Sequence, residues 1–308
     1  MSVNVLFAAG SDLWPDYKAA LREAIAEAGI ERFHLSQTIA PEEVDYIVYS
    51  PGSDVQDFTH YTRAKAVLNL WAGVEKIVGN ATLHIPLARM VDPAMTQGMV
   101  EWVTGHALRH HLGMDAHITA KPGEWNPQEP PIAWERKITV LGLGELGTAC
   151  ARMLGQLGFQ VHGWARSPKQ ISGVMSHTDL EEALRGANGV VLLLPDTQAT
   201  ENTLDADALA LLAPGAFVLN PGRGPLIDDD ALLDALDSGQ VGHATLDVFR
   251  TEPLPKDHPY WHHPRVTVTP HVASTTRPRW ASKTIAENIR RGEAGEAFIH
   301  VVDRESGY

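Results

Sequence analysis

A strand-like run that leads directly into three closely spaced glycines constrains the fold of this chain more than any other feature. Ile138–Leu141 is apolar, Gly142-Leu143-Gly144-Glu145-Leu146-Gly147 follows it, and a helix-compatible stretch continues to Gly158. In such a turn the first glycine permits the tight bend, the second lets the backbone approach a ligand, and the third lets helix and strand pack. The pattern predicts a β-α-β unit whose helix N-terminus holds the pyrophosphate of a dinucleotide.

The rest of the chain alternates in the same way between strand-like and helical runs. In the second half the strand candidates are Ile138–Leu141, Gln160–Trp164, Gly189–Leu194, Ala216–Asn220, His243–Asp247 and Val266–Thr269, with helical segments such as Asp179–Ala187 and Asp228–Ser238 between them. In the first third they are Val3–Ala8, Asp45–Tyr49 and Ala66–Trp71, with a helix at Tyr17–Ala28. This order predicts an α/β fold made of two Rossmann-like, doubly wound parallel sheets.

Length, charge and cysteine content limit the kind of protein this is. A chain of 308 residues has room for two domains. Its 38 acidic and 25 basic residues give a formal charge of −13, which argues against nucleic acid or an anionic membrane as a partner. The single cysteine, Cys150, forms no intramolecular disulfide. With no secretory signal pattern at the N-terminus and no long apolar run, we expect a cytoplasmic protein.

The residues after the second strand of the unit predict which dinucleotide binds. An acidic residue normally ends this strand and holds the ribose of NAD, but residues 146–178 contain no Asp or Glu. Gln160–Trp164 instead leads into Arg166, Ser167 and Lys169, whose guanidinium, hydroxyl and ammonium groups suit a 2′-phosphate. We therefore expect NADPH to be preferred over NADH. The alternative is that Arg166 and Lys169 are solvated loop charges.

Polar residues follow three of the later strands, at the edge where open α/β sheets bind ligands. Arg223 follows Ala216–Asn220, Glu252 follows the strand that Asp247 closes, and His271 follows Val266–Thr269. Each residue alone has an ordinary structural explanation, as an ion pair, a surface carboxylate or a buried histidine. Together they predict a catalytic group beside the nicotinamide.

These motifs make the resemblance specific. Leu141–Gly147, Leu194–Thr200, Asn220–Gly224, Leu246–Phe249 with Glu252–Pro255, and Thr269–Ser274 resemble the D-2-hydroxyacid dehydrogenase family, and more closely its glyoxylate/hydroxypyruvate reductase A branch. They cover most of residues 137–276, in family order. The resemblance implies that His271 protonates the carbonyl oxygen, that Glu252 hydrogen-bonds the imidazole, and that Arg223 grips the 2-oxo acid.

Further binding residues follow from the same resemblance. The implied cofactor-binding residues are Gly142, Leu143, Gly144, Glu145, Leu146, Gly147, Trp164, Arg166, Ser167, Lys169, Leu194, Pro195, Thr200, Pro221, Gly222, Arg223, Asp247 and His271. Trp71, Ala72 and Gly73, with Arg223 and His271, are the implied substrate-binding residues. Trp71 would narrow the pocket and favour small 2-oxo acids such as glyoxylate and hydroxypyruvate, which would be reduced to glycolate and D-glycerate.

Several alternatives remain open from the sequence. The substrate could be a bulkier 2-oxo acid such as phenylpyruvate, or the scaffold could oxidise formate or phosphite. A corepressor-like protein that senses dinucleotides would keep the fold and act through partners. No metal is expected, because His258, His262 and His263 lie in a proline-bounded loop without a regular ligand spacing.

The resemblance also implies how the domains are connected. The chain would begin in a substrate domain, cross along a helix at Asp92–His111 into the cofactor domain, and return along a helix at Trp280–Arg291. This makes the substrate domain discontinuous, at residues 1–95 and 276–308, around an NAD(P)-binding domain at residues 96–275. A homodimer is expected.

Overall fold

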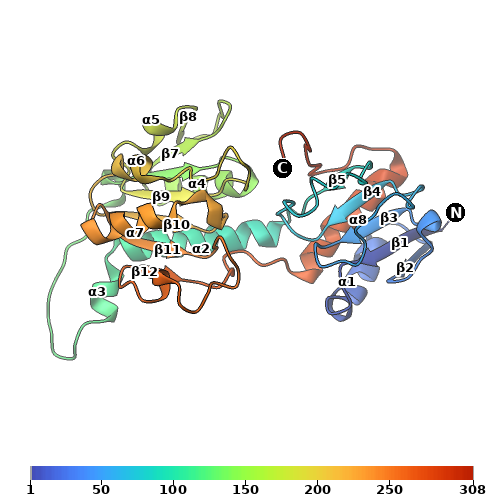
Figure 1. The fold of residues 1–308 in the computed structure, drawn as a ribbon, viewed down its shortest axis with the longest axis horizontal. Coiled ribbons are helices and arrows are strands. Elements are labelled where there is room, and N and C mark those ends of the chain that lie inside the picture. Colours follow the sequence, from blue (N-terminus) through green and yellow to red (C-terminus); the bar gives the residue numbers. More distant parts are fainter. Residues whose placement is uncertain (1, 308) are drawn as a thin grey trace. The chain divides into compact units, whose positions relative to one another are not determined.

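The computed structural model describes residues 2–307 and divides into two compact units (Figure 1). Unit 1 consists of the chain up to Met95 together with the chain from Thr276 onward, and unit 2 is Thr96–Thr275. Each unit is built on one sheet whose neighbouring strands are parallel. This confirms the predicted α/β class with two parallel sheets.

Unit 1 contains a five-stranded sheet in the order β2-β1-β3-β4-β5. Its strands are β1 (Val3–Ala8), β2 (Phe33–Ser36), β3 (Tyr46–Tyr49), β4 (Ala66–Asn69) and β5 (Leu87–Ala88), with a 3₁₀ turn η1 at Pro41–Glu43. Every residue of β3 and β4 is buried. Such continuous apolar runs are expected of parallel strands, because both faces of the sheet are covered.

Two helices of unit 1 pack against each other although they are far apart in the sequence (Figure 1). They are α1 (Trp14–Glu27) and α8 (Pro278–Ala294). Leu21 and Ile25 of α1 and Ile285 and Ile289 of α8 are almost fully buried, and each pair repeats at the spacing of one helical turn. The C-terminal helix therefore completes the core that the N-terminal strands begin.

Unit 2 contains a seven-stranded sheet in the order β12-β11-β10-β9-β6-β7-β8. The strands are β6 (Lys137–Leu141), β7 (Gln160–Trp164), β8 (Val174–His177), β9 (Gly189–Leu192), β10 (Ala216–Asn220), β11 (Val241–Leu246) and β12 (Val266–Val268). From β6 the chain first adds β7 and β8 on one side and then adds β9 on the other. The order therefore reverses between β6 and β9, which is where sheets of this type bind ligands.

Helices cover both faces of this sheet. One apolar cluster joins the sheet to α5 (Leu180–Leu184), α6 (Ala206–Ala210) and α7 (Asp229–Ser238), and a second joins it to α2 (Pro93–His111) and α4 (Glu145–Gln156). Short 3₁₀ turns lie at η2 (Ala133–Glu135), η3 (Gly224–Leu226) and η4 (Pro259–Trp261). The arrangement is doubly wound, as predicted.

The long helix α2 carries the chain from unit 1 into unit 2. The carboxylate of Asp92 accepts hydrogen bonds from the backbone N–H groups of Ala94 and Met95, at 2.8 and 2.9 Å, as an N-cap should. Gly113 takes a φ of +60° and is followed by a short helix, α3 (Met114–Ile118). After α3 the chain forms a long loop that leaves the body of the unit (Figure 1).

Some elements differ from the sequence prediction. β4 ends at Asn69, two residues before the predicted end, because the Asn69 side chain donates hydrogen bonds to the carbonyl oxygens of Trp71 and Gly73 and bends the chain there. The sequence did not predict β2, β5, β8, α3 or α6, all of which have five residues or fewer. No helix within residues 2–307 is long and apolar enough to cross a membrane.

Candidate active site

The glycine turn between β6 and α4 has the geometry that a dinucleotide requires. Gly142 has a φ of +102°, and a Cβ built on it would lie 2.5 Å from the carbonyl oxygen of Leu193. A Cβ on Gly147 would lie 1.7 Å from the carbonyl oxygen of Gly142, whereas a Cβ on Gly144 would meet nothing within 4 Å. The first and third positions therefore have no room for a side chain, whereas the second leaves open space before the positive end of α4. This is the position at which the sequence predicts that a pyrophosphate binds.

The end of β7 lies beside the glycine turn. The backbone N–H of Gly142 donates to the carbonyl oxygen of Trp164 at 3.0 Å, and Arg166, Ser167 and Lys169 are exposed immediately afterwards. An adenosine ribose bound to the turn would reach this position. The side chains there carry positive charge and a hydroxyl, so they suit a 2′-phosphate and leave the ribose without the usual carboxylate partner.

Glu252 and His271 are in direct contact. Nδ1 of His271 lies 2.7 Å from Oε2 of Glu252, and Oε1 of Glu252 accepts a hydrogen bond from the backbone N–H of Phe249 at 2.9 Å. The side chain of His271 is 54% exposed. When Nδ1 donates to the carboxylate, Nε2 is the ring nitrogen that can give or take a proton. This pair can therefore act as a general acid.

Asp247 holds the backbone around His271. Its side chain is buried, and its carboxylate accepts hydrogen bonds from the Thr269 hydroxyl at 2.5 Å and from the N–H groups of Val272 and Ala273, both at 2.9 Å. The carbonyl oxygen of Asp247 accepts from the N–H of His271 at 2.8 Å. His271 has a φ of +55°, which is unusual for a residue with a side chain, and these contacts fix it.

Arg223 lies on a loop that Asn220 shapes. The Asn220 amide donates to the carbonyl oxygen of Arg223 at 2.8 Å, and its oxygen accepts from the N–H of Gly222 at 3.1 Å. A guanidinium N–H of Arg223 donates to the carbonyl oxygen of Gly222 at 2.7 Å. A Cβ on Gly222 would lie 2.7 Å from the carbonyl oxygen of Leu192. The loop therefore packs tightly on the end of β9.

The topology places the predicted residues of unit 2 along one edge of the sheet. Arg223 follows β10, Glu252 follows β11 and His271 follows β12, and these three strands are neighbours. The glycine turn follows β6, Arg166 follows β7, and Leu194 with Pro195 follows β9. Because the strands are parallel, their carboxyl ends lie on the same side. One edge thus carries both the proposed dinucleotide groups and the acid pair.

Two groups of predicted residues show ordinary structural contacts. In the loop after β9, the Thr200 hydroxyl donates to the carbonyl oxygen of Pro195 at 2.7 Å and forms a turn with Thr197. In unit 1, Trp71, Ala72 and Gly73 follow β4, with the Trp71 side chain half-exposed. Contact of these residues with cofactor or substrate stays a prediction.

Two histidines of the proline-bounded loop, His258 and His263, have protein partners. Nδ1 of His258 accepts from the N–H of Tyr260 at 3.3 Å, and Nε2 of His263 lies 3.2 Å from Oδ1 of Asp237. Within residues 2–307, one group of three potential metal ligands occurs, formed by His110, Asp115 and His243. It was not predicted, because its members come from α2, α3 and β11.

The two imidazoles of this group lie against each other, and each has a hydroxyl partner. The ring centroids of His110 and His243 are 4.6 Å apart with planes 33° apart, and each Nε2 lies within 2.9 Å of a threonine hydroxyl, on Thr245 and Thr267. Burial lowers the pKa of His110 to about 3 and that of His243 to about 4. The two imidazoles are therefore neutral and largely buried, and the carboxylate of Asp115 forms an ion pair with Arg109 at 2.7 Å.

Comparison with known proteins identifies the family of this chain. Residues 104–273 match the family model for the NAD-binding domain of D-isomer specific 2-hydroxyacid dehydrogenases. The chain is 42% identical over 257 residues to a glyoxylate/hydroxypyruvate reductase A from Serratia proteamaculans, covering 80% of this chain and 82% of the relative. It is 35% identical over 302 residues to one from Yersinia enterocolitica, covering 94% and 95%.

Solved structures give the same result. A D-isomer specific 2-hydroxyacid dehydrogenase from Xanthobacter autotrophicus, in complex with NADPH, superposes with a TM-score of 0.91 at 38% identity, and all of both chains is covered. An NADPH-dependent glyoxylate/hydroxypyruvate reductase from Sinorhizobium meliloti, in complex with NADP, gives 0.85 at 32% identity, again over all of both chains. The chain therefore belongs to the D-isomer specific 2-hydroxyacid dehydrogenase family and is an NAD(P)-dependent oxidoreductase of this kind.

Proposed function

We propose that this protein reduces the small 2-oxo acids glyoxylate and hydroxypyruvate, with NADPH, to glycolate and D-glycerate. The observation that carries the proposal is the 2.7 Å contact between His271 and Glu252, which lies on the same sheet edge as the glycine turn. The relatives from Serratia and Yersinia are reductases of these two substrates, and the Sinorhizobium relative is NADPH-dependent.

The chain's own residues supply the acid and the electrostatic part of the reaction. When bound, NADPH provides a hydride for the carbonyl carbon. His271 gives a proton to the carbonyl oxygen as negative charge develops there, and Glu252 orients the ring through Nδ1. Arg223 binds the substrate carboxylate and polarises the carbonyl. Backbone N–H groups at Ala72 and Gly73 of unit 1 hold the other end of the carboxylate, as the family resemblance implies.

Each unit has its own task in this proposal. Unit 2 binds the dinucleotide, with the glycine turn on the pyrophosphate and Arg166, Ser167 and Lys169 on the 2′-phosphate. Unit 1 contributes the segment at Trp71, and the large ring of Trp71 excludes long substrate side chains. Phenylpyruvate is therefore a poor substrate, although the chemistry at the carbonyl would be the same.

We also propose a homodimer that forms through α3 and the loop after it. Large apolar side chains are exposed there, and Ile118 and Trp125 are 72% and 93% exposed. Exposed large apolar side chains are common at interfaces, and the family resemblance implies a dimer that forms through the long helix and its neighbouring loops. Light scattering after gel filtration should give twice the mass of one chain. Trp125→Ser should shift the protein to the monomer, whereas Met175→Ser, at an exposed position on β8, should not.

The cytoplasm is the proposed location. Cys150 is fully buried, and burial raises the pKa of its thiol to about 12, so the thiol stays protonated and unreactive. The fold relies on no disulfide, because the chain has one cysteine.

The test of this function is nicotinamide oxidation followed by absorbance. NADPH and NADH are each offered with glyoxylate, hydroxypyruvate and phenylpyruvate, to the native protein and to Arg166→Ala and Lys169→Ala. Fast NADPH oxidation with the two small acids, and loss of the preference over NADH in the variants, are expected. Turnover confined to phenylpyruvate would contradict the small pocket. Tight NADPH binding without turnover would favour a dinucleotide sensor.

A further inference from the structure

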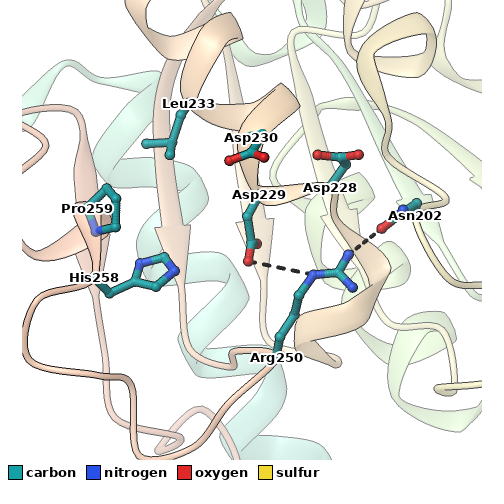
Figure 2. A pocket seen from close by; sticks show the side chains of 8 residues that line it. All are labelled: Asn202, Asp228, Asp229, Asp230, Leu233, Arg250, His258 and Pro259. Carbon is teal, nitrogen blue, oxygen red and sulfur yellow. Dashed lines mark hydrogen bonds and ion pairs between the residues drawn. The ribbon is translucent and has the colours of Figure 1, made fainter.

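A pocket of about 330 Å³ lies next to the two loops that carry Arg223 and Glu252. Figure 2 shows the Arg250 side chain in this pocket, reaching between Asp229 and Asn202. Arg250 belongs to the segment that connects β11 with Glu252. None of the roles assigned above uses it. Its contacts nevertheless join segments that hold the active-site residues.

The guanidinium of Arg250 binds two segments that are distant in the sequence. One terminal nitrogen donates to the carbonyl oxygens of Pro225 and Ile227 and to the Asn202 side chain, and the other lies 3.5 Å from Oε1 of Glu201. Nε lies 3.6 Å from Oδ2 of Asp229. Only the planar, branched donor set of an arginine can serve this many acceptors at once.

The first of these segments is the loop that carries Arg223. This loop runs from Asn220 to Ile227, so Arg250 binds its far end, while Asn220 fixes its beginning. The loop also packs on the Arg250 segment itself, because a Cβ built on Gly224 would lie 1.9 Å from the carbonyl carbon of Phe249. The backbone of the Arg223 loop at Gly224 is therefore in direct contact with the backbone at Phe249, next to Arg250.

The segment of Arg250 is also connected to the acid pair, through Phe249. The N–H of Phe249 donates to Oε1 of Glu252, and Oε2 of Glu252 contacts His271. A shift of the backbone at Arg250 would move Phe249 and with it the carboxylate that orients the imidazole. Arg250 thus lies between the loop of Arg223 and the Glu252–His271 pair. Phe249, next to Arg250 in the sequence, contacts both: its backbone packs against Gly224, and its N–H binds Glu252.

The charges around Arg250 favour its place. Asp229 accepts a hydrogen bond from the Tyr260 hydroxyl at 2.9 Å, and burial raises the pKa of Asp229 from its usual range. The guanidinium offsets this desolvation by bringing an opposite charge to the carboxylate. Asp228 and Asp230 lie along the same pocket wall and add negative potential (Figure 2). The cation is therefore stabilised where it binds the two loops.

We propose that Arg250 is a positioning residue, which sets the separation between Arg223 and the Glu252–His271 pair. It touches neither substrate nor cofactor, and it acts by holding the loop after β10 against the segment after β11. The proposal rests on the reductase function proposed above. Displacing a catalytic group by about 1 Å can slow a reaction by about 100-fold, so a modest relaxation of the two loops has a large kinetic effect.

The first experiment compares Arg250→Ala and Arg250→Lys with Arg265→Ala. Arg265 precedes β12, at the amino ends of the strands, and donates to the carbonyl oxygen of Leu236 at 2.8 Å. Its substitution also removes an arginine that binds backbone, but at a distance from the site. We expect both Arg250 variants to lower kcat for glyoxylate by about 10- to 100-fold, with little change in KM for NADPH. Arg265→Ala should keep kcat even if its melting temperature falls. An unchanged kcat in Arg250→Ala would overturn the proposal.

The pocket permits a second kinetic test, which a purely structural role would not pass. In Arg250→Ala the missing guanidinium leaves space that opens to solvent beside Asp229. Added methylguanidinium should restore part of kcat in this variant and have no such effect in Arg265→Ala. Absence of any rescue in a folded Arg250→Ala protein would argue that the covalent side chain serves stability alone and would overturn the role.

Hydrogen exchange measured by mass spectrometry separates this proposal from the reductase function. In the protein without substrate, Arg250→Ala should increase exchange in peptides that cover residues 221–228 and 248–253, and leave those of β6 and α4 unchanged. A native protein that turns over none of the 2-oxo acids would refute the reductase function, and the exchange result would still decide whether Arg250 holds the two loops. Unchanged exchange would refute the positioning role even in an active enzyme.

Discussion

The second and third glycines of the turn serve different purposes, and two alanine substitutions separate them. Gly144 takes φ −78° and ψ −162° at the N-cap of α4, a conformation open to any residue, and a Cβ there meets nothing within 4 Å. A Cβ on Gly147 would lie 1.7 Å from the carbonyl oxygen of Gly142, far below the 3.0 Å that real Cβ atoms keep. Gly147→Ala should therefore destabilise the free protein more than Gly144→Ala does.

The magnitudes follow from these distances. Overpacking costs about 1–3 kcal/mol, and a clash this close belongs at the upper end, while the better helix propensity of alanine returns about 1 kcal/mol. Gly147→Ala should thus lose about 2 kcal/mol, or roughly 4–8 °C in melting temperature for a unit of this size. Gly144→Ala should lose about 1 kcal/mol, because alanine is a poorer N-cap than glycine but meets no steric clash at this position.

The substitution that has the smaller effect on stability, Gly144→Ala, should weaken the binding of NADPH. If a pyrophosphate approaches the backbone at Gly144, the added methyl group occupies its place, and the Kd for NADPH should rise at least about 10-fold, or 1.4 kcal/mol. Nicotinamide fluorescence titration gives the Kd, and thermal unfolding without ligand gives the stability. A Gly144→Ala protein that binds NADPH as tightly as the native one would refute the placement of the pyrophosphate on this turn.

Two further predictions concern the buried polar groups of unit 2. Asp247→Asn should lower the unfolding free energy by about 1–3 kcal/mol and reduce kcat, because an amide cannot accept hydrogen bonds from both Val272 and Ala273 while it keeps the one from Thr269. Urea unfolding and steady-state kinetics measure these two effects. A variant with native stability would contradict the prediction. His110 and His243 stay neutral in the fold because burial holds their pKa values near 3 and 4, so the unfolded chain binds more protons below about pH 6.5. The contribution of the two histidines to stability is complete above that pH and is lost as the pH falls toward 4, by up to about 1.4 kcal/mol per pH unit for each histidine. Urea unfolding from pH 7 to 4.5 should show this dependence of the unfolding free energy on pH, and His243→Gln should reduce its slope. An equal slope in both proteins would contradict the prediction.

The parts of the fold that could be predicted are those where one local pattern decides the structure. β1, β7 and β10 have the predicted bounds. β1 and β10 are short, mostly apolar runs, and β7 alternates between buried and more exposed residues. α2 begins as predicted because Asp92 and Pro93 together form a strong start signal. The glycine turn was predictable because its three glycines have separate steric reasons.

The parts that could not be predicted depend on contacts between distant segments. β8 (Val174–His177) has no strong apolar pattern, and it forms because β7 offers an unpaired edge. The contact between His110 and His243 joins residues 133 positions apart, and no local sequence pattern predicts it. Arg250 reads as an ordinary loop arginine in the sequence, and its role emerges only when the loops after β10 and β11 lie side by side.

The active-site edge divides its work between exposed and buried groups. The side chains of His271 and Glu252, which contact each other, are 54% and 35% exposed, so they remain available to a ligand. The groups that hold their loops, Asp247 and Asn220, are each 1% exposed and use their polar atoms on neighbouring backbone. Buried polar groups hold one geometry firmly, because an unmade hydrogen bond there is costly. Arg250 combines the two properties, since it is partly exposed yet satisfied by several acceptors. It is therefore the point on this edge where the spacing of the catalytic loops can be altered without removing either a reacting group or a buried one.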